Sequence, residues 1–359
     1  MMSQLNPVPI VDAREGGALR HAQEFAARAR GLRAELLGWF PFFMPPLLPI
    51  LDLLARQWLK RAGSPYVQEI GAIASVLGFS GVWFLNNSYQ WTCTALARNE
   101  DGAPWLARTL DWPFPGLGRY VDIVHMRGPA GDFYNVSWPG YVGVLTALAP
   151  GRFAAAINQA PMRRRGHGRL LRLYDLAANA IVTVLRVHDV PPDQLLRRVF
   201  ETCRDYAEAR RMLELTPVAR PAIFTLVGCA PGEQCVIERT EREARTRDHE
   251  TVAANDWRNS MAGWEARIGT RRLLSVTFEQ AAANSRERCA MLSGWHGNFA
   301  RDSFAWVRPP VLNYFTRLAV EMCPANGTLR VIGYELPLGG ELPEPVTLRT
   351  EICGSRAAA

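Results

Sequence analysis

The pattern of apolar and polar positions divides the chain near residue 92 into a helical part and a strand-rich part. Apolar residues recur every three or four positions in 17–35 and in 66–91, where Ile70 and Ile73 share one face. This spacing is typical of amphipathic helices, whose apolar stripe packs against the rest of the molecule. The first 92 residues are therefore predicted to form a helical segment.

A run without charge interrupts this helical part at residues 36–50, with the sequence LLGWFPFFMPPLLPI. Its four prolines disfavour a regular helix, because each lacks an N–H donor and clashes with the preceding turn. The run is also shorter than the roughly 20 apolar residues that cross a bilayer. Two interpretations stay open: the run covers the core, or residues 36–61 make a peripheral contact with a membrane surface.

From Cys93 onward, short apolar runs broken by Gly, Pro or Asp indicate β-strands. The runs 94–98 and 104–109 flank the turn sequence NEDG and predict a β-hairpin. Blocks of strands and helices then follow, with strands at 121–126, 133–138, 141–148 and 153–158, helices at 170–186, 193–203 and 206–214, strands at 222–228, 235–238 and 251–255, and helices at 270–282 and 285–293. Such blocks predict an α+β fold in which segregated helices cover sheets.

Composition adds few constraints to this picture. The chain has 359 residues and 48% hydrophobic content, enough for one large domain or two modest ones. The formal charge is +7, and Lys60 is the only lysine, so nearly all basic residues are arginine. One dense basic run, 162–169, is expected to be a solvated loop or, alternatively, a contact for phosphates or anionic lipid heads. We expect no nucleic-acid partner.

The cysteines argue against a metal site. There are seven at irregular spacing, and no His lies at ligand spacing near Cys229 and Cys235. We therefore expect neither a metal nor a cofactor. The N-terminal residues lack the basic stretch and apolar run of a secretory signal. A cytoplasmic protein with free thiols is the expectation, with peripheral membrane attachment left open.

The residues that could carry chemistry lie in segment 91–116, WTCTALARNEDGAPWLARTLDWPFPG. Cys93 stands at the start of the first arm of the predicted hairpin, and Arg108 and Asp111 lie on the returning arm. Because antiparallel pairing lays the arms side by side, both charged residues are expected close to Cys93. A cysteine at a strand start is by itself more typical of a core position, so the assignment depends on further motifs.

Those motifs resemble the acid ceramidase and N-acylethanolamine acid amidase group, within the choloylglycine hydrolase superfamily of N-terminal nucleophile hydrolases. The resemblance covers roughly residues 65–295, in the segments EIGAIASVLGFS, FLNNSYQWTCT, ARTLDWPF, GYVGVLTALAPGRFAAAINQ, AIFTLVGCAPGEQCVIERT, TVAANDW and NSRERCAML. It implies a four-layer αββα sandwich. It also implies self-cleavage between Thr92 and Cys93, with 1–92 as a helical pro-segment or small subunit and 93–359 as the catalytic unit.

The resemblance further implies a role for each matching residue. Cys93 matches the nucleophile that cleavage frees, and Arg108 and Asp111 match the charged residues of the hairpin. Asn255 matches the Asn of the oxyanion site, and Arg286 matches a supporting Arg. Ser285 stands where the acid ceramidase pattern has Asp, which leaves Arg288 as the other choice, and Asn158 and Trp112 are expected to face the substrate.

The residue types suit amide hydrolysis without a histidine. A new α-amine has a reference pKa of about 7.7–8.0, so the amine of Cys93 can take the proton of its own thiol. Asp111 would orient that amine, Arg108 would favour the thiolate, and Asn255 would donate to the oxyanion. The implied reaction is hydrolysis of a linear amide in an N-acyl amide, such as a ceramide-like or N-acylethanolamine-like lipid, through a Cys93 thioester.

Three other hypotheses stay open. An acyltransferase would pass the acyl group from the thioester to an amine instead of water. A non-catalytic lipid-binding relative would keep the fold and need no self-cleavage. A papain-like Cys–His site is the rival chemistry, but none of the six histidines lies in a recognisable motif with Cys93.

Overall fold

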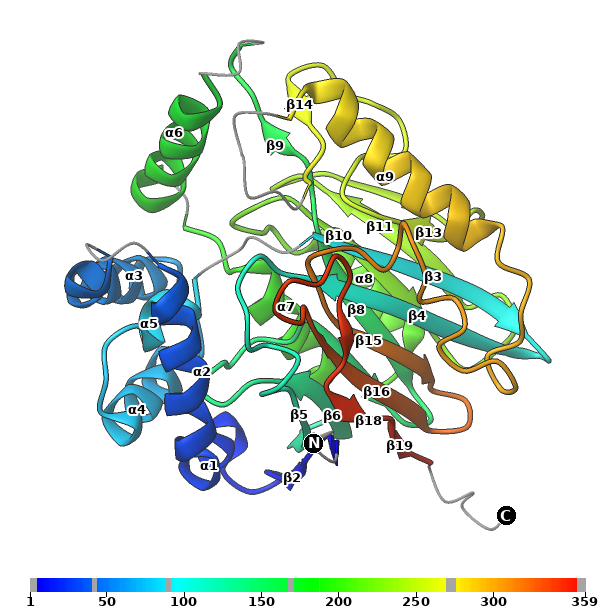
Figure 1. Ribbon diagram of the computed structural model, residues 1–359, viewed down its shortest axis with the longest axis horizontal. Helices are drawn as coiled ribbons and strands as arrows, with labels where there is room; N and C mark the ends of the chain where they lie inside the picture. Colours follow the sequence, from blue (N-terminus) through cyan, green and yellow to red (C-terminus); the bar gives the residue numbers. More distant parts are fainter. Residues whose placement is uncertain are drawn as a thin grey trace.

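The computed structural model describes residues 5–40, 44–87, 92–166, 171–186, 188–268 and 276–353. Within these ranges, helices at the N-terminal end adjoin two large β-sheets, as Figure 1 shows. The predicted α+β class is therefore confirmed.

The first sheet has eight strands in the order β12-β11-β10-β8-β7-β6-β5-β2. Its neighbours pair antiparallel except at one edge, where β2 runs parallel to β5. The strands are β2 (Ile10–Asp12), β5 (Asp122–Gly128), β6 (Gly131–Ser137), β7 (Thr146–Ala149), β8 (Phe153–Gln159), β10 (Ala222–Val227), β11 (Gln234–Arg239) and β12 (Ala244–Arg247).

The second sheet has seven strands, in the order β13-β3-β4-β15-β16-β17 with β19 also paired to β16. They are β3 (Thr92–Glu100), β4 (Ala103–Asp111), β13 (Val252–Ala253), β15 (Thr316–Cys323), β16 (Thr328–Glu335), β17 (Glu344–Pro345) and β19 (Thr350–Ile352). Two small pairs complete the strands: β1 (Asn6–Pro7) with β18 (Thr347–Leu348), and β9 (Met162–Arg163) with β14 (Trp264–Glu265).

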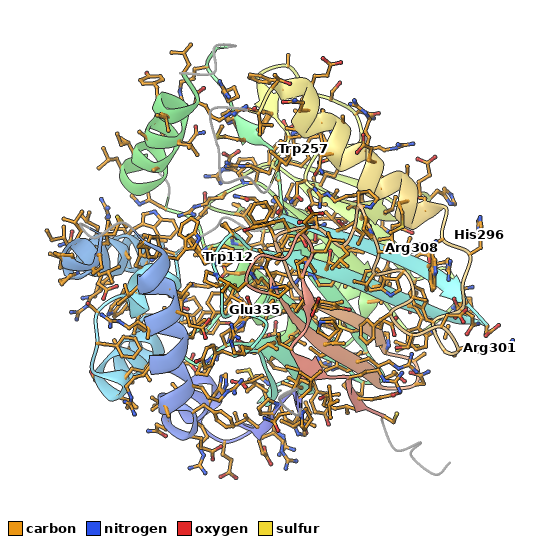
Figure 2. All side chains as sticks on the ribbon, in the orientation of Figure 1. Trp112, Trp257, His296, Arg301, Arg308 and Glu335 are labelled. Atoms are coloured by element: carbon orange, nitrogen blue, oxygen red, sulfur yellow. The ribbon has the colours of Figure 1, made fainter. Side chains whose placement is uncertain are left out.

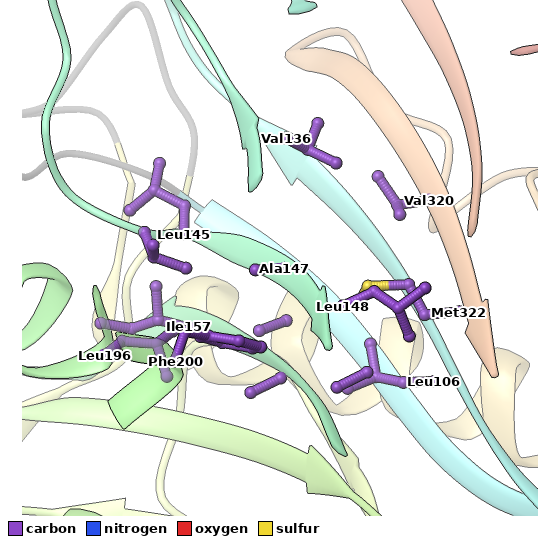
Figure 3. Close-up of a cluster of buried hydrophobic side chains, with 14 of the residues drawn as sticks. Leu106, Val136, Leu145, Ala147, Leu148, Ile157, Leu196, Phe200, Val320 and Met322 are labelled. Carbon is purple, nitrogen blue, oxygen red and sulfur yellow. The ribbon is translucent and has the colours of Figure 1, made fainter. Parts of the chain in front are cut away.

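The two large sheets pack face to face. Strands β3 and β4 contact β8, and both also contact β10. Leu106, Val320 and Met322 of the second sheet share one buried cluster with Val136 and Leu148 of the first (Figure 3). Because side chains alternate between the faces of a strand, every second residue of β3 and β4 enters this inner layer. Burial of apolar surface between the sheets is therefore a main source of stability.

Helices cover the outer faces of both sheets. Helix α7 (Pro192–Thr202) packs on β5 and β6, and α8 (Tyr206–Leu215) packs on β10, β11 and β12. On the other side, α9 (Phe278–Ser293) packs on β3 and β13. Helix α9 starts at a capping box, in which Thr277 and Gln280 satisfy each other's backbone N–H groups. Its position over the start of β3 brings α9 to the predicted site.

The N-terminal residues form a separate helical group that remains tied to both sheets. The helices are α1 (Gly17–Glu24), α2 (Ala26–Trp39), η1 (Pro45–Leu47), α3 (Leu48–Arg61), α4 (Val67–Leu77) and α5 (Val82–Leu85). They gather on one side of the molecule around their own apolar cluster (Figure 1). Ahead of them, β2 extends the first sheet and β1 pairs with β18 beside the second.

The charge-free run at 36–50 is not one continuous helix. Helix α2 ends at Trp39, and a 3₁₀ turn at Pro45–Leu47 leads into α3, as the four prolines of the run indicated. Residues 41–43 lie outside the described ranges. No helix among the described residues is long and apolar enough to cross a membrane.

Several element boundaries differ from the prediction. The helical pattern of 66–91 is broken after Leu77, because Gly78 and Gly81 take left-handed φ angles of 68° and 109°. The two helices expected from 270 to 293 form one helix, α9, within the described residues. Strands β15 and β16 were not predicted, and they supply the centre of the second sheet.

Candidate active site

The hairpin of β3 and β4 determines the direction in which Cys93 points. Its two-residue turn, Asp101 and Gly102, has φ angles of 51° and 81°, which Asp and Gly tolerate better than most residues. The turn sets a register that pairs Cys93 with Leu110, so Arg108 lies on the same face, two residues away along β4. A slip of one residue would turn both side chains to the opposite face.

The sulfur of Cys93 lies in the inner layer beside the guanidinium of Arg108. Arg108 Nη2 is 2.7 Å from Cys93 Sγ and also donates to the Ile157 carbonyl oxygen at 3.3 Å. Its Nη1 donates to Thr146 Oγ1. Cys93 and Arg108 are buried. The structure therefore places Arg108, as expected, at the sulfur, where its positive charge favours the thiolate.

The main chain of Cys93 is held from the opposite face of the sheet by Arg288 of α9. Arg288 Nη1 donates to the Cys93 carbonyl oxygen at 2.8 Å and to Thr94 Oγ1 at 2.9 Å. Its Nη2 donates to Asn255 Oδ1 at 3.0 Å. The same guanidinium lies 3.6 Å from the carboxylate of Asp111. One planar fork of donors thus links four groups around the nucleophile.

Arg286, the residue expected in this position, lies elsewhere. It is exposed, whereas Arg288 is 1% exposed, because residues two apart on a helix point in different directions. The structure thus assigns the position beside Cys93 to Arg288. The alternative between the two arginines, which the sequence left open, depends on which face of α9 packs on β3.

Asn255 holds the backbone nitrogen of Cys93. The Cys93 N–H donates to Asn255 Oδ1 at 2.9 Å, while Asn255 Nδ2 donates to the Gln159 carbonyl oxygen at 2.8 Å. The donor that we expected to face an oxyanion is therefore used by Gln159 in this uncut chain. The acceptor of Asn255 faces the backbone nitrogen of Cys93, which the predicted cleavage would turn into an amine, and this corrects the geometry we expected at this residue.

Asp111 is the last of the residues around the Cys93 main chain, and it lies on the face of the second sheet that α9 covers. Its carboxylate accepts hydrogen bonds from Asn313 Nδ2 at 2.8 Å and Thr316 Oγ1 at 2.9 Å. It pairs with Thr92 across the hairpin, directly before the predicted cleavage point. The expectation that Asp111 lies near the Cys93 main chain therefore agrees with the structure.

Burial and charge oppose each other at both titratable groups. Complete burial raises the pKa of the Cys93 thiol, and Arg108 acts in the opposite direction. Burial also raises the pKa of Asp111, while Arg288 and the hydrogen bonds from Asn313 and Thr316 lower it. Burial therefore favours the neutral thiol of Cys93, and the charge of Arg108 favours the thiolate.

Sequence analysis missed several residues that hold this group. Thr146 contacts Arg108, and Asn313 and Thr316 contact Asp111. Thr146 lies on β7, within one of the segments that carry the resemblance, whereas Asn313 and Thr316 lie beyond residue 295, where the resemblance ends. No local pattern marks Asn313 and Thr316, because their position depends on the pairing of β15 with β4.

The two residues predicted to face the substrate occupy different places. Asn158 lies on β8 with its Nδ2 donating to the carbonyl oxygens of Ala253 and Ala254, at 3.1 and 3.2 Å. Its Oδ1 is buried without a hydrogen-bond donor among the described residues. Trp112 is buried next to Phe114, with ring centroids 5.1 Å apart, and lies centrally beside the N-terminal helices in Figure 2.

A cavity of about 250 Å³ begins at this group. Arg108 and Asn158 form part of its wall, and apolar side chains that include Leu145 and Ile157 form another part. Helix α6 (Leu171–Arg186) contributes to the wall opposite them. The cavity gives a small molecule a place beside Arg108, the residue that contacts the Cys93 sulfur.

Histidine takes no part in the contacts of Cys93 that the described residues make. His21 lies 2.9 Å from a carboxylate oxygen of Asp122, and His125 lies 3.1 Å from one of Asp132. Both pairs belong to the packing of the first sheet. Among the described residues, no cluster of three or more His, Cys, Asp or Glu side chains has the arrangement of a metal site.

Comparison with known proteins gives no match to a family model. Over 203 residues the chain is 27% identical to the N-acylethanolamine-hydrolyzing acid amidase of Cavia porcellus, a stretch that covers 55% of this chain and 54% of that protein. Over 124 residues it is 32% identical to the acid ceramidase of Homo sapiens, which covers 34% of this chain and 29% of that protein. The chain is acid ceramidase-like.

The resemblance inferred from the motifs is thus confirmed. The acid ceramidase-like chain spans about half the length of the amidase and 29% of the human ceramidase that it matches. The Caenorhabditis elegans ortholog of N-acylethanolamine-hydrolyzing acid amidase aligns with 19% identity and a TM-score of 0.47, over 65% of this chain and 93% of that one. A bile acid hydrolase mutant from Clostridium perfringens aligns with 11% identity and a TM-score of 0.40, over 73% and 92%. Both TM-scores lie below 0.5, and the sheets and helices described above define the fold of this chain.

Proposed function

We propose that this acid ceramidase-like chain is an N-terminal nucleophile hydrolase that cuts itself before Cys93 and then hydrolyses the linear amide bond of an N-acyl amide. One observation carries the proposal: a polar side chain holds each of three atoms of the buried Cys93. Arg108 contacts the sulfur, Asn255 the backbone nitrogen and Arg288 the carbonyl oxygen. A cysteine that merely fills the core needs no such partners.

The arrangement of layers supports the same proposal. Helices α7 and α8, the two sheets and helix α9 follow one another in the order expected of an αββα sandwich. Under this proposal residues 1–92 are the small subunit and residues 93–359 the catalytic unit. Because β1 and β2 pair with strands of the catalytic unit, the small subunit stays bound after cleavage.

Self-cleavage would proceed through the thiol of the uncut chain. Cys93 Sγ attacks the carbonyl carbon of Thr92, and the bond from that carbon to the Cys93 nitrogen breaks as the nitrogen takes up a proton. The product is a thioester on Cys93 with a free α-amine. Water then hydrolyses the thioester, leaving a carboxylate on Thr92 and a free thiol on Cys93.

The cleaved enzyme would act on its substrate in the same way. The α-amine of Cys93 accepts the thiol proton, the thiolate attacks the substrate carbonyl, and the protonated amine returns a proton to the leaving nitrogen. Water then releases the acid from the thioester. Arg108 favours the thiolate, Asn255 and Asp111 hold the amine, and Arg288 positions the carbonyl of Cys93.

The apolar acyl group has an aromatic surface close to the hairpin. Trp39 and Phe40 at the end of α2 meet Phe114, with ring centroids 4.5 and 5.0 Å apart, and Phe114 in turn packs on Trp112. Such rings bind apolar chains through large contact areas. This cluster, which includes the predicted substrate-facing Trp112, supports an N-acyl lipid as the substrate.

We also propose a peripheral contact with membranes through residues 36–61. Helix α3 exposes Ile50, Leu53 and Leu54, each about half accessible to solvent. Lys60 and Arg61 stand in its last turn. An apolar face next to cations is the pattern of helices that lie in the interface of an anionic bilayer.

Incubation of the purified protein with N-acyl amides that share one acyl chain tests the proposed activity. We expect release of the fatty acid by the wild-type protein and none by Cys93→Ala. A competing amine in the same assay measures any acyl transfer. Equal release by the wild-type protein and Cys93→Ala would exclude Cys93 as the nucleophile.

A further inference from the structure

The wall of the cavity beside the Cys93 site also contains cationic side chains. Besides Arg108 and Asn158, it includes apolar residues and the arginines Arg220 and Arg267. The backbone N–H of Arg267 donates to the Asn255 carbonyl oxygen at 3.0 Å. A backbone hydrogen bond therefore joins Arg267 to Asn255, whose side chain accepts from the Cys93 nitrogen.

Arg267 differs from the other arginines nearby in having no bonded partner. Within the described ranges, no hydrogen bond or ion pair engages its guanidinium, and its Nε has no access to solvent. Burial lowers the pKa of Arg267 to about 10, with neighbouring arginines acting in the same direction and the charge of Glu265 acting against them. The guanidinium still carries its positive charge at neutral pH, and no anion is bonded to it among the described residues.

The acidic residues in this region are already occupied. Glu265 bonds to both Arg164 and Arg172, and Asp175 pairs with Arg164 at 2.7 Å. These four side chains are buried and link α6 to β9 and β14. The basic run at 162–169 is thus not only a solvated loop, because Arg164 belongs to this buried network. Arg267 lies close enough to this network for the charge of Glu265 to act on it, but no acidic side chain of the described residues forms an ion pair with it.

A residue of the cavity wall also indicates which half of an amide substrate would enter the cavity. Asn158 presents a buried Oδ1 that lacks a donor among the described residues, and it lies where the cavity meets the Cys93 site. A secondary amide N–H is a donor of the required kind, and it belongs to the amine half of the substrate. If the amide N–H donates to Asn158 Oδ1, the half that follows the N–H would extend into the cavity whose wall includes Arg267.

We infer that the substrate is an N-acyl amino acid, whose carboxylate binds Arg267 in the wall of the cavity. This inference rests on the proposed amide hydrolysis and narrows it to one class of amine. A carboxylate accepts from a guanidinium in a bidentate, charge-assisted pair and neutralises the buried charge. Ethanolamine and sphingoid bases offer only neutral hydroxyl groups at this distance from the amide.

Three substrates of one acyl length test the inference: the N-acylglycine, its neutral N-acylglycinamide, and an N-acylethanolamine whose acyl chain ends in a carboxylate. We expect kcat/KM for the N-acylglycine to exceed that for the glycinamide about ten- to a hundredfold, the range of a charge-assisted hydrogen bond. A preference for the third substrate would place the anion on the acyl half and overturn the assignment to amino acids.

Variants identify the guanidinium responsible. Arg267→Gln should lower the ratio of kcat/KM for N-acylglycine over N-acylglycinamide at least about tenfold, because glutamine keeps some donors and loses the charge. Arg301→Gln removes the same charge from an exposed residue in a loop at the edge of the molecule (Figure 2) and should leave the ratio unchanged. An unchanged ratio in a folded Arg267→Gln protein would refute the inference.

A binding measurement separates this inference from the proposed reaction. Calorimetry on Cys93→Ala compares the affinity for N-acylglycine with that for N-acylglycinamide and requires no turnover. Tighter binding of the N-acylglycine supports the inference even if no amide is hydrolysed, and equal binding refutes it. Absence of turnover of all three substrates by the wild-type protein contradicts only the proposed function.

Discussion

At the scale of single residues, the two faces of β3 divide the tasks around Cys93. Arg108 reaches the sulfur from the inner layer, and Arg288 reaches the carbonyl oxygen from the side of α9. Strand alternation causes this division, because successive side chains point to opposite faces. Cys93 is therefore held through both its side chain and its main chain, and a change on either face should affect it.

Arg288 and Arg286 form a matched pair for testing the outer face. Arg288→Lys should lower both the rate of self-cleavage and kcat/KM on the order of a hundredfold, because lysine cannot keep several donors in one plane. Arg286→Lys makes the same change on an exposed position and should have no effect. The appearance of the cut chains on a denaturing gel and initial rates measure the two quantities. Loss of activity only in Arg286→Lys would reverse our choice.

Asp193 predicts a pH dependence of stability. Burial raises its pKa to about 7, and Tyr141 donates a hydrogen bond to its carboxyl group at 2.6 Å. In the folded protein the carboxyl group of Asp193 therefore keeps its proton up to a higher pH than in the unfolded chain, where the pKa of an Asp is near 3.9. Its contribution to the free energy of unfolding is full below about pH 4 and is lost as pH rises through about 7.

Asp193→Asn should remove this dependence. Relative to the wild-type protein, the variant should gain melting temperature as pH rises from 5 to 8, since asparagine carries no charge to bury. Asp101→Asn, in an exposed turn where Asn also tolerates a positive φ, is the matched control. A difference between Asp193→Asn and the wild-type protein that stays constant with pH would contradict the assignment.

At the scale of elements, the sequence predicted what depends on local pattern. The hairpin at Cys93, helices α7 and α8 and most strands of the first sheet were found, because their periodicity and turn residues agree. The strands β15 and β16 were missed, as were Asn313 and Thr316, which hold Asp111. Sheet order depends on pairing between distant segments, and one sequence contains no direct sign of it.

The N-terminal segment was predicted as a helical pro-segment or small subunit. In the structure it also pairs with strands that lie beyond residue 92. The Val8 N–H donates to Thr350 Oγ1 at 2.7 Å, between β1 and β2. Asp122 of β5 lies 2.9 Å from both His21 and Arg28 of the N-terminal helices. These contacts join the segment to both large sheets, independently of the peptide bond before Cys93.

We therefore expect the two chains to stay together after cleavage. The cut protein should elute as one species under native conditions and separate into two chains only on denaturation. Removal of residues 1–12, which form β1 and β2, should weaken this association. Native mass spectrometry measures both. A native species that lacks the small chain would contradict the role of these strands.

At the scale of the whole molecule, exposed apolar side chains concentrate on two helices. Helix α3 exposes Ile50, Leu53 and Leu54, and α6 exposes Leu173 and Ile181 among others. In Figure 1 both helices lie on the same side of the molecule. Exposed apolar patches of this kind mark surfaces that bind partners or membranes.

Replacement of Ile50, Leu53 and Leu54 by serine should lower the fraction of protein that co-sediments with anionic vesicles. The change removes apolar area that would enter the interface and leaves the buried face of α3 intact. The matched control replaces the exposed Leu215, Leu338 and Leu348 by serine. Equal sedimentation of the two triple variants would contradict a membrane contact through α3.

The central claim is that Cys93 becomes a chain end. Intact mass spectrometry and N-terminal sequencing of the active protein test it most directly, beside Cys93→Ala prepared in the same way. We expect the active protein to consist of two chains, one ending at Thr92 and one beginning at Cys93, and Cys93→Ala to remain a single chain of about 40.1 kDa. A fully active wild-type protein that remains one uncut chain of that mass would contradict the account.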